Sequence, residues 1–380
     1  MKIAISFGAF LPVPPLRGGA TEKIWTAYAT RLAARGHEVI AYSRQWPGLP
    51  DDAMLDGVRH VRLPGHDHYP RLWQNLLLDL RWSLRVRRAL PKDALVISHN
   101  IALPWLLTTP PRRHAAPVAV TLGRMPKGQL RFYRRVSRIY AFSEAVRSVA
   151  HAQYPAVSPL IRVIPNAIDV ASFAQPRRTH DPAAAVTIGY IGRLHPEKGL
   201  GLLAGAIRTI AQIPDLPAWR LMLIGPSDVA AGGGGAAWLH DLRRMLPDSS
   251  PRGVIEILPP IWNSAQLAEQ YRQIDVFCYP SLSEQGETFG VSALEAMAAG
   301  AVPVVSNLDC FRDFARDGEN AFVFNRSSAN PAAALAEKIT RLLRDSALRV
   351  KLANQAQATA RRFDYEVVVP ELETDLAALR

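Results

Sequence analysis

Cysteine and long apolar runs are both scarce in this chain of 380 residues. Cys278 and Cys310 are the only two thiols, and both lie in apolar or mixed segments. This is typical of reduced, buried cysteines and excludes a disulfide framework. No apolar run approaches the roughly 18 residues that a membrane-spanning helix needs. Residues 1–10 have the pattern of a strand followed by a proline-rich loop, and not of a secretory signal. We therefore expect a cytoplasmic protein.

A phosphate-binding P-loop is also missing. The glycine run at 232–235 lacks the Lys-Ser/Thr pair of that motif, so it predicts a mobile loop and not a phosphate site. Hydrophobic residues make up 48% of the chain, which is enough to fill the cores of a globular protein. The length fits two domains of roughly 170–200 residues each.

The positive charge is concentrated in the first half of the chain. Residues 1–170 carry 24 Lys and Arg against 10 Asp and Glu, a net charge of +14, whereas the remainder carries 21 against 23, a net charge of −2. This asymmetry indicates an anionic partner of the first half, and the alternative is an arginine-rich surface without a specific partner. Nucleic acid is not expected, because no recognised nucleic-acid-reading module is present.

Short apolar strands alternate with helices in the first half. The pattern predicts helices at 21–35 and 70–90, and strands at 2–7, 38–42, 58–63, 95–98, 118–122, 138–142 and 161–164. A parallel sheet covered on both faces is the expected result.

The same alternation restarts after 175–185, which has the composition of a linker. It predicts strands at 187–191, 220–224, 254–258, 276–279 and 302–305, helices at 200–213, 238–245, 265–273 and 292–299, and a mostly helical tail from 331. We predict an α/β fold of two doubly wound domains, 1–175 and 186–360, that face an inter-domain cleft. The helix at 361–380 is expected to return to the first domain.

Three loops carry candidate ligand-binding residues. Gly18 and Gly19 precede the N-terminus of a predicted helix. Because glycine has no side chain, the backbone there can approach a ligand closely, although a plain turn explains the glycine pair equally well. Arg193 and Lys198 flank the first strand-to-helix turn of the second half and suit a diphosphate, with two solvated surface cations as the alternative.

The segment 284–300 (EQGETFGVSALEAMAAG) is the most informative. Glu287 lies in a loop, whereas Glu295 lies inside an apolar helix, where a carboxylate needs a partner. We expect Glu295 to bind hydroxyls such as a ribose diol and Glu287 to bind sugar hydroxyls. A capping glutamate and an exposed helical glutamate are the alternative interpretation.

These motifs, taken in order, resemble glycosyltransferase family 4, a retaining family with the GT-B fold, over nearly the whole chain. The matching segments are Gly18-Gly19, 35–39 (RGHEV), 164–169 (IPNAID), 192–194 (GRL), 197–199 (EKG), 287–295 (E-x7-E) and 300–305 (GAVPVV). The resemblance implies the GT-B arrangement of two Rossmann-like domains, with acceptor binding in the first and nucleotide-sugar binding in the second.

The resemblance also implies a donor-binding set: Gly18, Gly19, Arg193, Lys198, Glu287, Thr288, Phe289, Gly290, Val291 and Glu295. Within it, Arg193 and Lys198 neutralise the diphosphate leaving group, Glu295 binds the ribose and Glu287 the transferred sugar. No cofactor and no metal are expected, because cations and helix N-termini do that work and no Asp-x-Asp pair stands where a cation would be held.

One position departs from the family pattern. Gly123 stands where many members have a histidine that contacts the donor sugar, so Arg124, Lys127 or His99 are candidates to replace it. Arg124 and Lys127, with Asn166, are also the candidates for the acceptor side, and His99 joins Arg193, Lys198 and Glu287 as a candidate catalytic residue.

The acceptor is expected to be a glycan or a polyprenyl-linked compound. Cations follow Leu and Trp residues between 72 and 92, a pattern typical of a helix on an anionic membrane surface, although core packing with a solvated face explains it equally well. The resemblance thus implies a retaining glycosyltransferase that uses a UDP- or GDP-sugar, and the basic first half predicts that it is peripheral on the inner membrane face. A sugar-nucleotide epimerase and a non-catalytic nucleotide-sugar-binding subunit are the alternatives.

Overall fold

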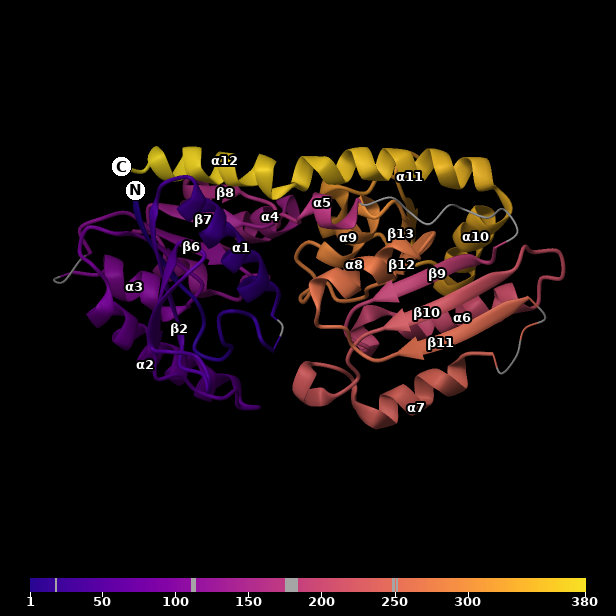
Figure 1. Cartoon of the computed structure of the whole chain (residues 1–380), viewed down its shortest axis with the longest axis horizontal. Coiled ribbons are helices and arrows are strands. Elements are labelled where there is room, and N and C mark those ends of the chain that lie inside the picture. The colour runs from indigo at the N-terminus through magenta and orange to yellow at the C-terminus, as the bar shows by residue number, and fades with distance from the viewer. Residues whose placement is uncertain (18, 111–113, 175–183, 248–249, 251) are drawn as a thin grey trace. The chain divides into compact units, whose positions relative to one another are not determined.

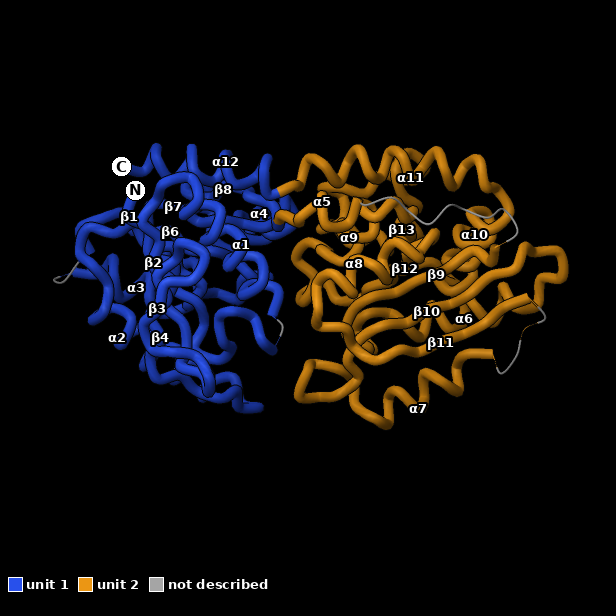
Figure 2. The backbone as a smooth tube through the Cα atoms, viewed as in Figure 1, with its two compact units in different colours: residues 1–166, 365–380 blue, residues 167–364 orange. Residues whose placement is uncertain are grey.

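The computed structural model of the chain describes all residues except 18, 111–113, 175–183, 248–249 and 251. It divides into two compact units, which Figure 2 shows in blue and orange. Unit 1 contains residues 1–166 and 365–380, and unit 2 contains residues 167–364. The predicted linker at 175–185 lies mostly outside the described residues, and the boundary between the units falls before it, at Asn166–Ala167.

Unit 1 is built on one sheet of eight strands in the order β3-β4-β2-β1-β5-β6-β7-β8. The strands are β1 (Lys2–Ser6), β2 (Glu38–Arg44), β3 (Asp52–Leu55), β4 (Val58–Leu63), β5 (Leu95–Ser98), β6 (Val118–Leu122), β7 (Arg138–Ala141) and β8 (Ile161–Val163). The helices are α1 (Ala20–Ala34), α2 (Leu72–Ala89), α3 (Ala102–Thr108), α4 (Glu144–Gln153) and α12 (Tyr365–Ala377) (Figure 1).

All strand pairs of this sheet are parallel except one, because β3 runs antiparallel to β4 at the edge. The central parallel strands β1, β5 and β6 are largely apolar and buried, as helices on both faces of a sheet require. In the core, the fully buried Trp82 of α2 donates a hydrogen bond from Nε1 to the Phe7 carbonyl, 3.0 Å away. Helix α2 begins at Leu72, so Pro70 precedes the helix and does not lie in its first turn.

The C-terminal helix α12 belongs to unit 1. The phenol of Tyr140 on β7 donates to the buried Asp375 carboxylate of α12 at 2.8 Å, and Arg138 lies 2.9 Å from the same carboxylate. At the surface, Arg35 contacts Glu373 of α12 at 2.5 Å. These contacts fix α12 to both the sheet and the end of α1.

Unit 2 contains a second sheet, wholly parallel, of six strands in the order β11-β10-β9-β12-β13-β14. The strands are β9 (Val186–Ile191), β10 (Trp219–Ile224), β11 (Gly253–Leu258), β12 (Val276–Tyr279), β13 (Val302–Ser306) and β14 (Phe322–Phe324). The helices are α5 (Val170–Phe173), α6 (Leu200–Ala211), α7 (Gly235–Met245), α8 (Ser264–Arg272), α9 (Val291–Ala298), α10 (Pro331–Arg344) and α11 (Ser346–Ala360).

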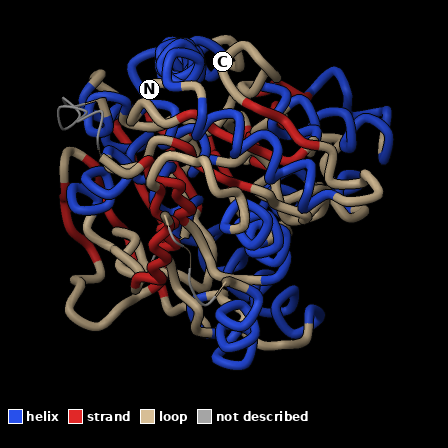
Figure 3. Tube along the Cα trace, turned by 90° about the vertical axis from the view of Figure 1, so that its right-hand side faces the viewer, coloured by secondary structure: helices blue, strands red, loops and turns tan. Residues whose placement is uncertain are grey.

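Helices lie on both sides of the strands, as the blue and red tubes of Figure 3 show. Each unit therefore has the Rossmann-like, doubly wound architecture expected from the alternating sequence pattern. The site-bearing loops of unit 2 leave the carboxyl ends of β9, β10 and β12, where ligands bind in such sheets. None of the helices formed by the described residues combines the length and apolar character required to cross a bilayer.

Candidate functional site

A buried ion pair lies at the carboxyl end of the unit 2 sheet. Lys198 Nζ lies 2.7 Å from Glu287 Oε2, and both side chains are only 9% exposed. Tyr279, the last residue of β12, completes a triangle: its hydroxyl donates to Glu287 Oε2 at 3.0 Å and accepts from Lys198 Nζ at 3.1 Å. Burial first, and then the Glu287 charge, raises the pKa of the Tyr279 phenol well above its usual value.

This triangle joins Lys198 and Glu287, which the sequence predicts as separate site residues, and adds Tyr279, which the sequence motifs do not include. A polar hydroxyl at the carboxyl end of a central strand is the signal that could have identified Tyr279. The carboxylate of Glu287 is compensated by a cation and a phenol, as a buried charge requires.

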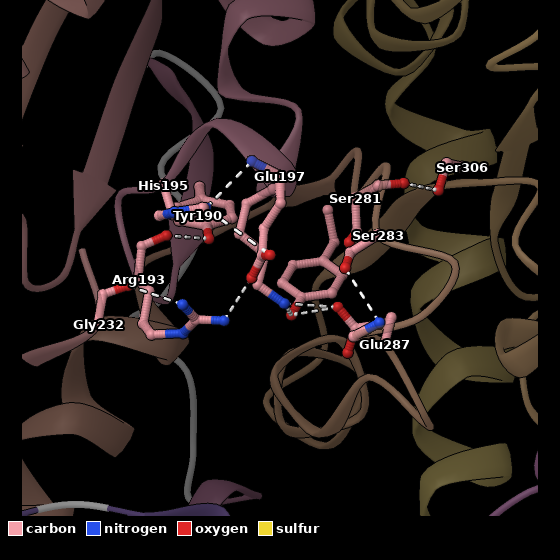
Figure 4. Close-up of polar contacts among 12 residues, drawn as sticks. Tyr190, Arg193, His195, Glu197, Gly232, Ser281, Ser283, Glu287 and Ser306 are labelled. Carbon is pink, nitrogen blue, oxygen red and sulfur yellow. Dashed lines mark hydrogen bonds and ion pairs between the residues drawn. The ribbon is translucent and has the colours of Figure 1, made fainter. Parts of the chain in front are cut away.

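Arg193 lies next to the triangle but is partly exposed, with 42% of its side chain accessible. Its Nη2 contacts the Glu197 carboxylate at 2.5 Å, and its Nη1 donates to the Gly232 carbonyl at 2.7 Å (Figure 4). The hydroxyl of Tyr190 in turn donates to the Arg193 carbonyl at 2.8 Å. The structure therefore brings Arg193 and Lys198 to one strand-to-helix turn, and the solvated-cation alternative does not describe the buried Lys198.

The glycine run at 232–235 packs closely against its surroundings, and the mobility that the sequence predicted for it stays a prediction. A Cβ on Gly233 would lie 2.2 Å from the Ser227 backbone, and one on Gly234 would lie 2.4 Å from the Trp238 ring. The Gly234 amide donates to the Leu194 carbonyl at 2.9 Å. A side chain at Gly233 or Gly234 would collide with these neighbours, so glycine is needed for the loop to pack against the turn that carries Arg193.

Two more glycines hold the helices that border the site. Gly199 has φ +72° before α6, and a Cβ there would lie 1.9 Å from the Pro280 carbonyl. Gly290 has φ +95° before α9, and a Cβ there would meet the Phe311 ring at 2.5 Å. Both conformations favour glycine. Because α9 begins at Val291, the amides of Ala293 and Leu294 donate to the Gly290 carbonyl, whereas those of Val291 and Ser292 have no acceptor within the helix and are suited to bind an anion.

The remaining predicted residues of this segment lie around that helix end. Thr288 is half-buried, whereas the Phe289 ring is buried and packs against Phe314 and Phe363. Glu295 is buried inside α9, and its carboxylate accepts a hydrogen bond from the Tyr271 hydroxyl at 2.9 Å. The partner that a buried helical carboxylate needs is thus provided by the protein, and its predicted contact with a ribose stays a prediction.

In unit 1, Gly19 precedes α1 with φ +100°. A Cβ on Gly19 would lie 2.2 Å from Glu22 Oε2, so a larger residue would collide with that carboxylate. Glu22 is buried, and burial raises its pKa. Glu22 is not among the site residues predicted from the sequence, although an acidic residue in the first helical turn beside the glycine pair is a signal that could have identified it. Gly18 lies outside the described residues.

His99 follows β5 and is enclosed by aromatic rings. Its ring centroid lies 4.7 Å from that of Trp25 and 5.6 Å from that of Phe7, and Nδ1 lies 2.6 Å from the Thr121 hydroxyl. Burial lowers the pKa of His99 to about 3, so its ring is neutral at physiological pH. Its Nε2 is buried and has no hydrogen-bond partner among the described residues.

The other unit 1 candidates follow β6 and β8. Arg124 and Lys127 are exposed, whereas Asn166 is buried. A Cβ on Gly123 would lie 3.7 Å from the Thr21 hydroxyl, so a side chain has room at the position where the family pattern has histidine. Within the part of the chain that the structure describes, no group of three or more His, Cys, Asp or Glu could hold a metal ion. The expected independence from metal stays a prediction.

Comparison with solved structures assigns the fold to the GT-B class. A sucrose-phosphate synthase from Thermosynechococcus elongatus superimposes with a TM-score of 0.79 at 21% identity, covering 99% of this chain and 98% of that one. HepE from Anabaena, in complex with UDP and glucose, superimposes with a TM-score of 0.73 at 19% identity, covering both chains completely.

Two family profiles match consecutive parts of the sequence. Residues 21–172 match Glycosyltransferase Family 4, and residues 175–359 match Glycosyl transferases group 1. The chain therefore belongs to glycosyltransferase family 4, as its ordered motifs indicated.

Curated relatives are similar mainly over part of the chain. The phosphatidyl-myo-inositol mannosyltransferase of Mycobacterium tuberculosis is 33% identical over 213 residues, 55% of this chain and 52% of that protein. The chain thus matches about half the length of this relative. Spore coat protein SA of Bacillus subtilis is 24% identical and covers 98% of both chains.

Proposed function

We propose that this protein transfers a sugar, with retention of configuration, from a nucleoside-diphosphate sugar to a hydroxyl of a glycan or lipid-linked acceptor. The observation that carries the proposal is the pair of cations, Arg193 and Lys198, at one strand-to-helix turn of the unit 2 sheet. The free amides at the start of α9 add a second source of positive potential in the same unit. These groups suit a diphosphate, and family membership supports that assignment.

The rate enhancement would come from charge stabilisation at the leaving group. A nucleoside diphosphate gains negative charge as it departs, and pre-organised cations that are already fixed by protein contacts stabilise that charge most effectively. In this proposal Arg193 and Lys198 stabilise the leaving diphosphate, while Glu287 binds the transferred sugar and Glu295 the ribose. Since these cations and helix amides supply the compensation, no metal is required.

The remaining donor contacts are proposed from the family motifs. They involve backbone groups at Gly18, Gly19, Thr288, Phe289, Gly290 and Val291. The sites assigned to the acceptor side are Arg124, Lys127 and Asn166, and His99 is assigned to the catalytic group, in place of the family histidine that contacts the donor sugar. Because His99 is neutral, it would act as a hydrogen-bonding group toward a sugar hydroxyl and not as a cation.

We also propose that unit 1 binds an anionic membrane surface through α2. Four large apolar side chains at its start are exposed: Leu72 by 68%, Trp73 by 59%, Leu76 by 40% and Leu77 by 42%. Arg71, which precedes the helix, and Arg81, which lies further along it, are exposed as well. An exposed apolar turn flanked by arginines is the composition of an interfacial helix. Sedimentation with vesicles of phosphatidylcholine, with and without phosphatidylglycerol, tests this: the same failure to bind both would end the membrane proposal.

The donor proposal is tested by a thermal-shift screen against UDP, GDP, ADP, dTDP and CMP, with Arg193→Ala measured alongside. We expect one nucleoside diphosphate to raise the melting temperature of the wild type and not that of the variant. Arg193→Ala is expected to lower the transfer rate by about one to three decades. No shift with any nucleotide, or activity of the variant within about twofold of wild type, would contradict the donor assignment.

Product analysis separates the two other candidate functions. A transferase releases nucleoside diphosphate only when an acceptor is present, whereas a sugar-nucleotide epimerase converts the donor without an acceptor. A non-catalytic subunit would bind the donor and release nothing. Acceptor-dependent release measured by chromatography of the nucleotide products therefore distinguishes all three.

A further inference from the structure

A second group of cations lies in unit 1, away from the residues assigned to the donor. The loop 64–68 follows β4, Arg44 ends β2, and Arg81 and Arg85 lie on α2, which follows that loop in the chain. Strands β4, β2 and β1 are neighbours in the sheet, so the loops at their carboxyl ends share one edge. This edge is where ligands bind in open parallel sheets.

The arginines converge on His66. Arg85 Nη1 lies 3.0 Å from His66 Nε2 and also donates to the Pro64 carbonyl at 2.5 Å. Arg44 Nη1 donates to the His66 carbonyl at 2.9 Å and to the Phe10 carbonyl at 2.7 Å. The pKa of His66 is lowered, first by burial and then by the charges of Arg85, Arg81 and Arg44.

Little negative charge offsets these cations. The carboxylate that acts on His66 is that of Asp67, which lies 3.0 Å from Arg44 Nη1 but is 87% exposed and therefore screened by solvent. Arg17 adds a further cation nearby, because its guanidinium lies 5.7 Å above the Trp46 ring, and Arg44 lies 4.9 Å above the same ring. Arg17, Arg44, Arg81 and Arg85, together with His66, are called the His66 cluster below.

The contacts that hold the loops in place use only some of the hydrogen-bond donors of these arginines. The hydrogen bonds described for Arg44 and Arg85 all come from Nη1, and Arg44 Nε is buried with no partner among the described residues. Arg81 is exposed and makes no hydrogen bond or ion pair within the described ranges. A purely structural tie needs neither Arg81 nor several guanidinium groups around one histidine, so an anionic ligand is the better explanation. A phosphate matches the forked geometry of guanidinium donors.

We propose that the His66 cluster binds a phosphate carried by the acceptor. This inference rests on the proposed transferase function and gives the acceptor a chemical class: a phosphate ester whose apolar part lies along the exposed start of α2. The proposed phosphate site and the proposed apolar surface are adjacent in the sequence, because the loop 64–68 is followed after a few residues by the exposed turn at Leu72 and Trp73. The cluster is distinct from Arg124 and Lys127, which follow β6 and were the cations expected from the sequence to face the acceptor.

The test uses the full chain and two probes, inorganic phosphate and vesicles of phosphatidylcholine with phosphatidylglycerol. Arg81→Gln and Arg85→Gln are compared with Arg88→Gln, a matched control that removes the same charge from an exposed position of the same helix. We expect Arg81→Gln and Arg85→Gln to weaken binding of at least one probe by about tenfold, and Arg88→Gln by less than about twofold. Since Arg85 also holds the Pro64 carbonyl, the exposed Arg81 keeps the test valid if Arg85→Gln disturbs folding.

Each outcome decides the proposal. Binding of inorganic phosphate that depends on Arg81 and Arg85 supports it and indicates a soluble phosphate ester if vesicles do not bind. Vesicle binding that depends on the same residues and is displaced by inorganic phosphate supports it and indicates a lipid-borne phosphate. An equal loss in all three variants indicates general surface charge and overturns it, as does the absence of binding to both probes. The nucleotide thermal shift, measured on the same samples, reports separately whether the donor proposal has failed.

Discussion

Replacing Lys198 by methionine is predicted to destabilise unit 2, quite apart from any effect on activity. Methionine keeps much of the side-chain volume but removes the cation that lies 2.7 Å from Glu287 Oε2. The Tyr279 hydroxyl remains at 3.0 Å and still donates to that carboxylate. Glu287 would therefore be left as a buried charge with one neutral donor.

The size of the loss follows from burial. Breaking a buried ion pair by removing one partner costs about 3–5 kcal/mol, and the surviving phenol places Lys198→Met near the lower limit. In a unit of this size each kcal/mol lowers the melting temperature by about 2–4 °C, so we expect a decrease of about 6–12 °C. The exposed Arg193 serves as the comparison, because Arg193→Met loses a partly solvated pair and should cost at most about 1 kcal/mol.

Urea denaturation and calorimetry at neutral pH measure this prediction. Glu287→Gln added to Lys198→Met should recover much of the loss, because the double variant no longer buries a carboxylate without its cation. A Lys198→Met variant as stable as wild type, or a double variant no more stable than Lys198→Met alone, would refute the reasoning.

Three further predictions concern single positions. Gly290→Ala places a Cβ 2.5 Å from the Phe311 ring on a backbone with φ +95°. It should lower the free energy of unfolding, measured by urea titration, by about 1–3 kcal/mol. An unchanged urea midpoint would contradict the packing described. Glu197→Gln removes the carboxylate that competes for Arg193, so calorimetric titration should show nucleoside diphosphate binding tighter by about two- to fivefold. Weaker binding would instead show that Glu197 positions Arg193. The pKa of His99 is lowered to about 3, so the unfolded state takes up a proton that the native state does not. Stability should therefore fall as pH drops below about 6.5, less so in His99→Gln, and equal pH dependence of both proteins would oppose this assignment.

The sequence predicted most of the parallel strands, because the central ones are short buried apolar runs. It missed β3, which lies at the sheet edge and is mostly exposed, and β14, which has only three residues. The pattern of Asp52–Leu55 has no apolar alternation that periodicity would detect, since its apolar Met54 and Leu55 face solvent. Edge pairing depends on a neighbouring strand and not on the segment itself.

For the candidate site, the sequence predicted which charged residues matter but not what they contact. Lys198 and Glu287 are 89 residues apart, so only folding reveals that they compensate each other. Likewise, Glu295 was expected to need a partner, but its partner Tyr271 lies on another helix. The close packing of the glycine run at 232–235 against Ser227 and Trp238 could not be predicted from the local sequence.

The return of α12 to unit 1 makes unit 2 a continuous insertion within it. The two ends of that insertion are paired: the Ile168 amide donates to the Phe363 carbonyl at 2.9 Å, and the Val170 amide donates to the Asp364 carboxylate at 3.2 Å. An inserted domain whose ends meet can be exchanged as a cassette at two neighbouring peptide bonds. Chimaeras joined at Asn166–Ala167 and Asp364–Tyr365 therefore offer a route to combine the nucleotide preference of one family member with the acceptor preference of another.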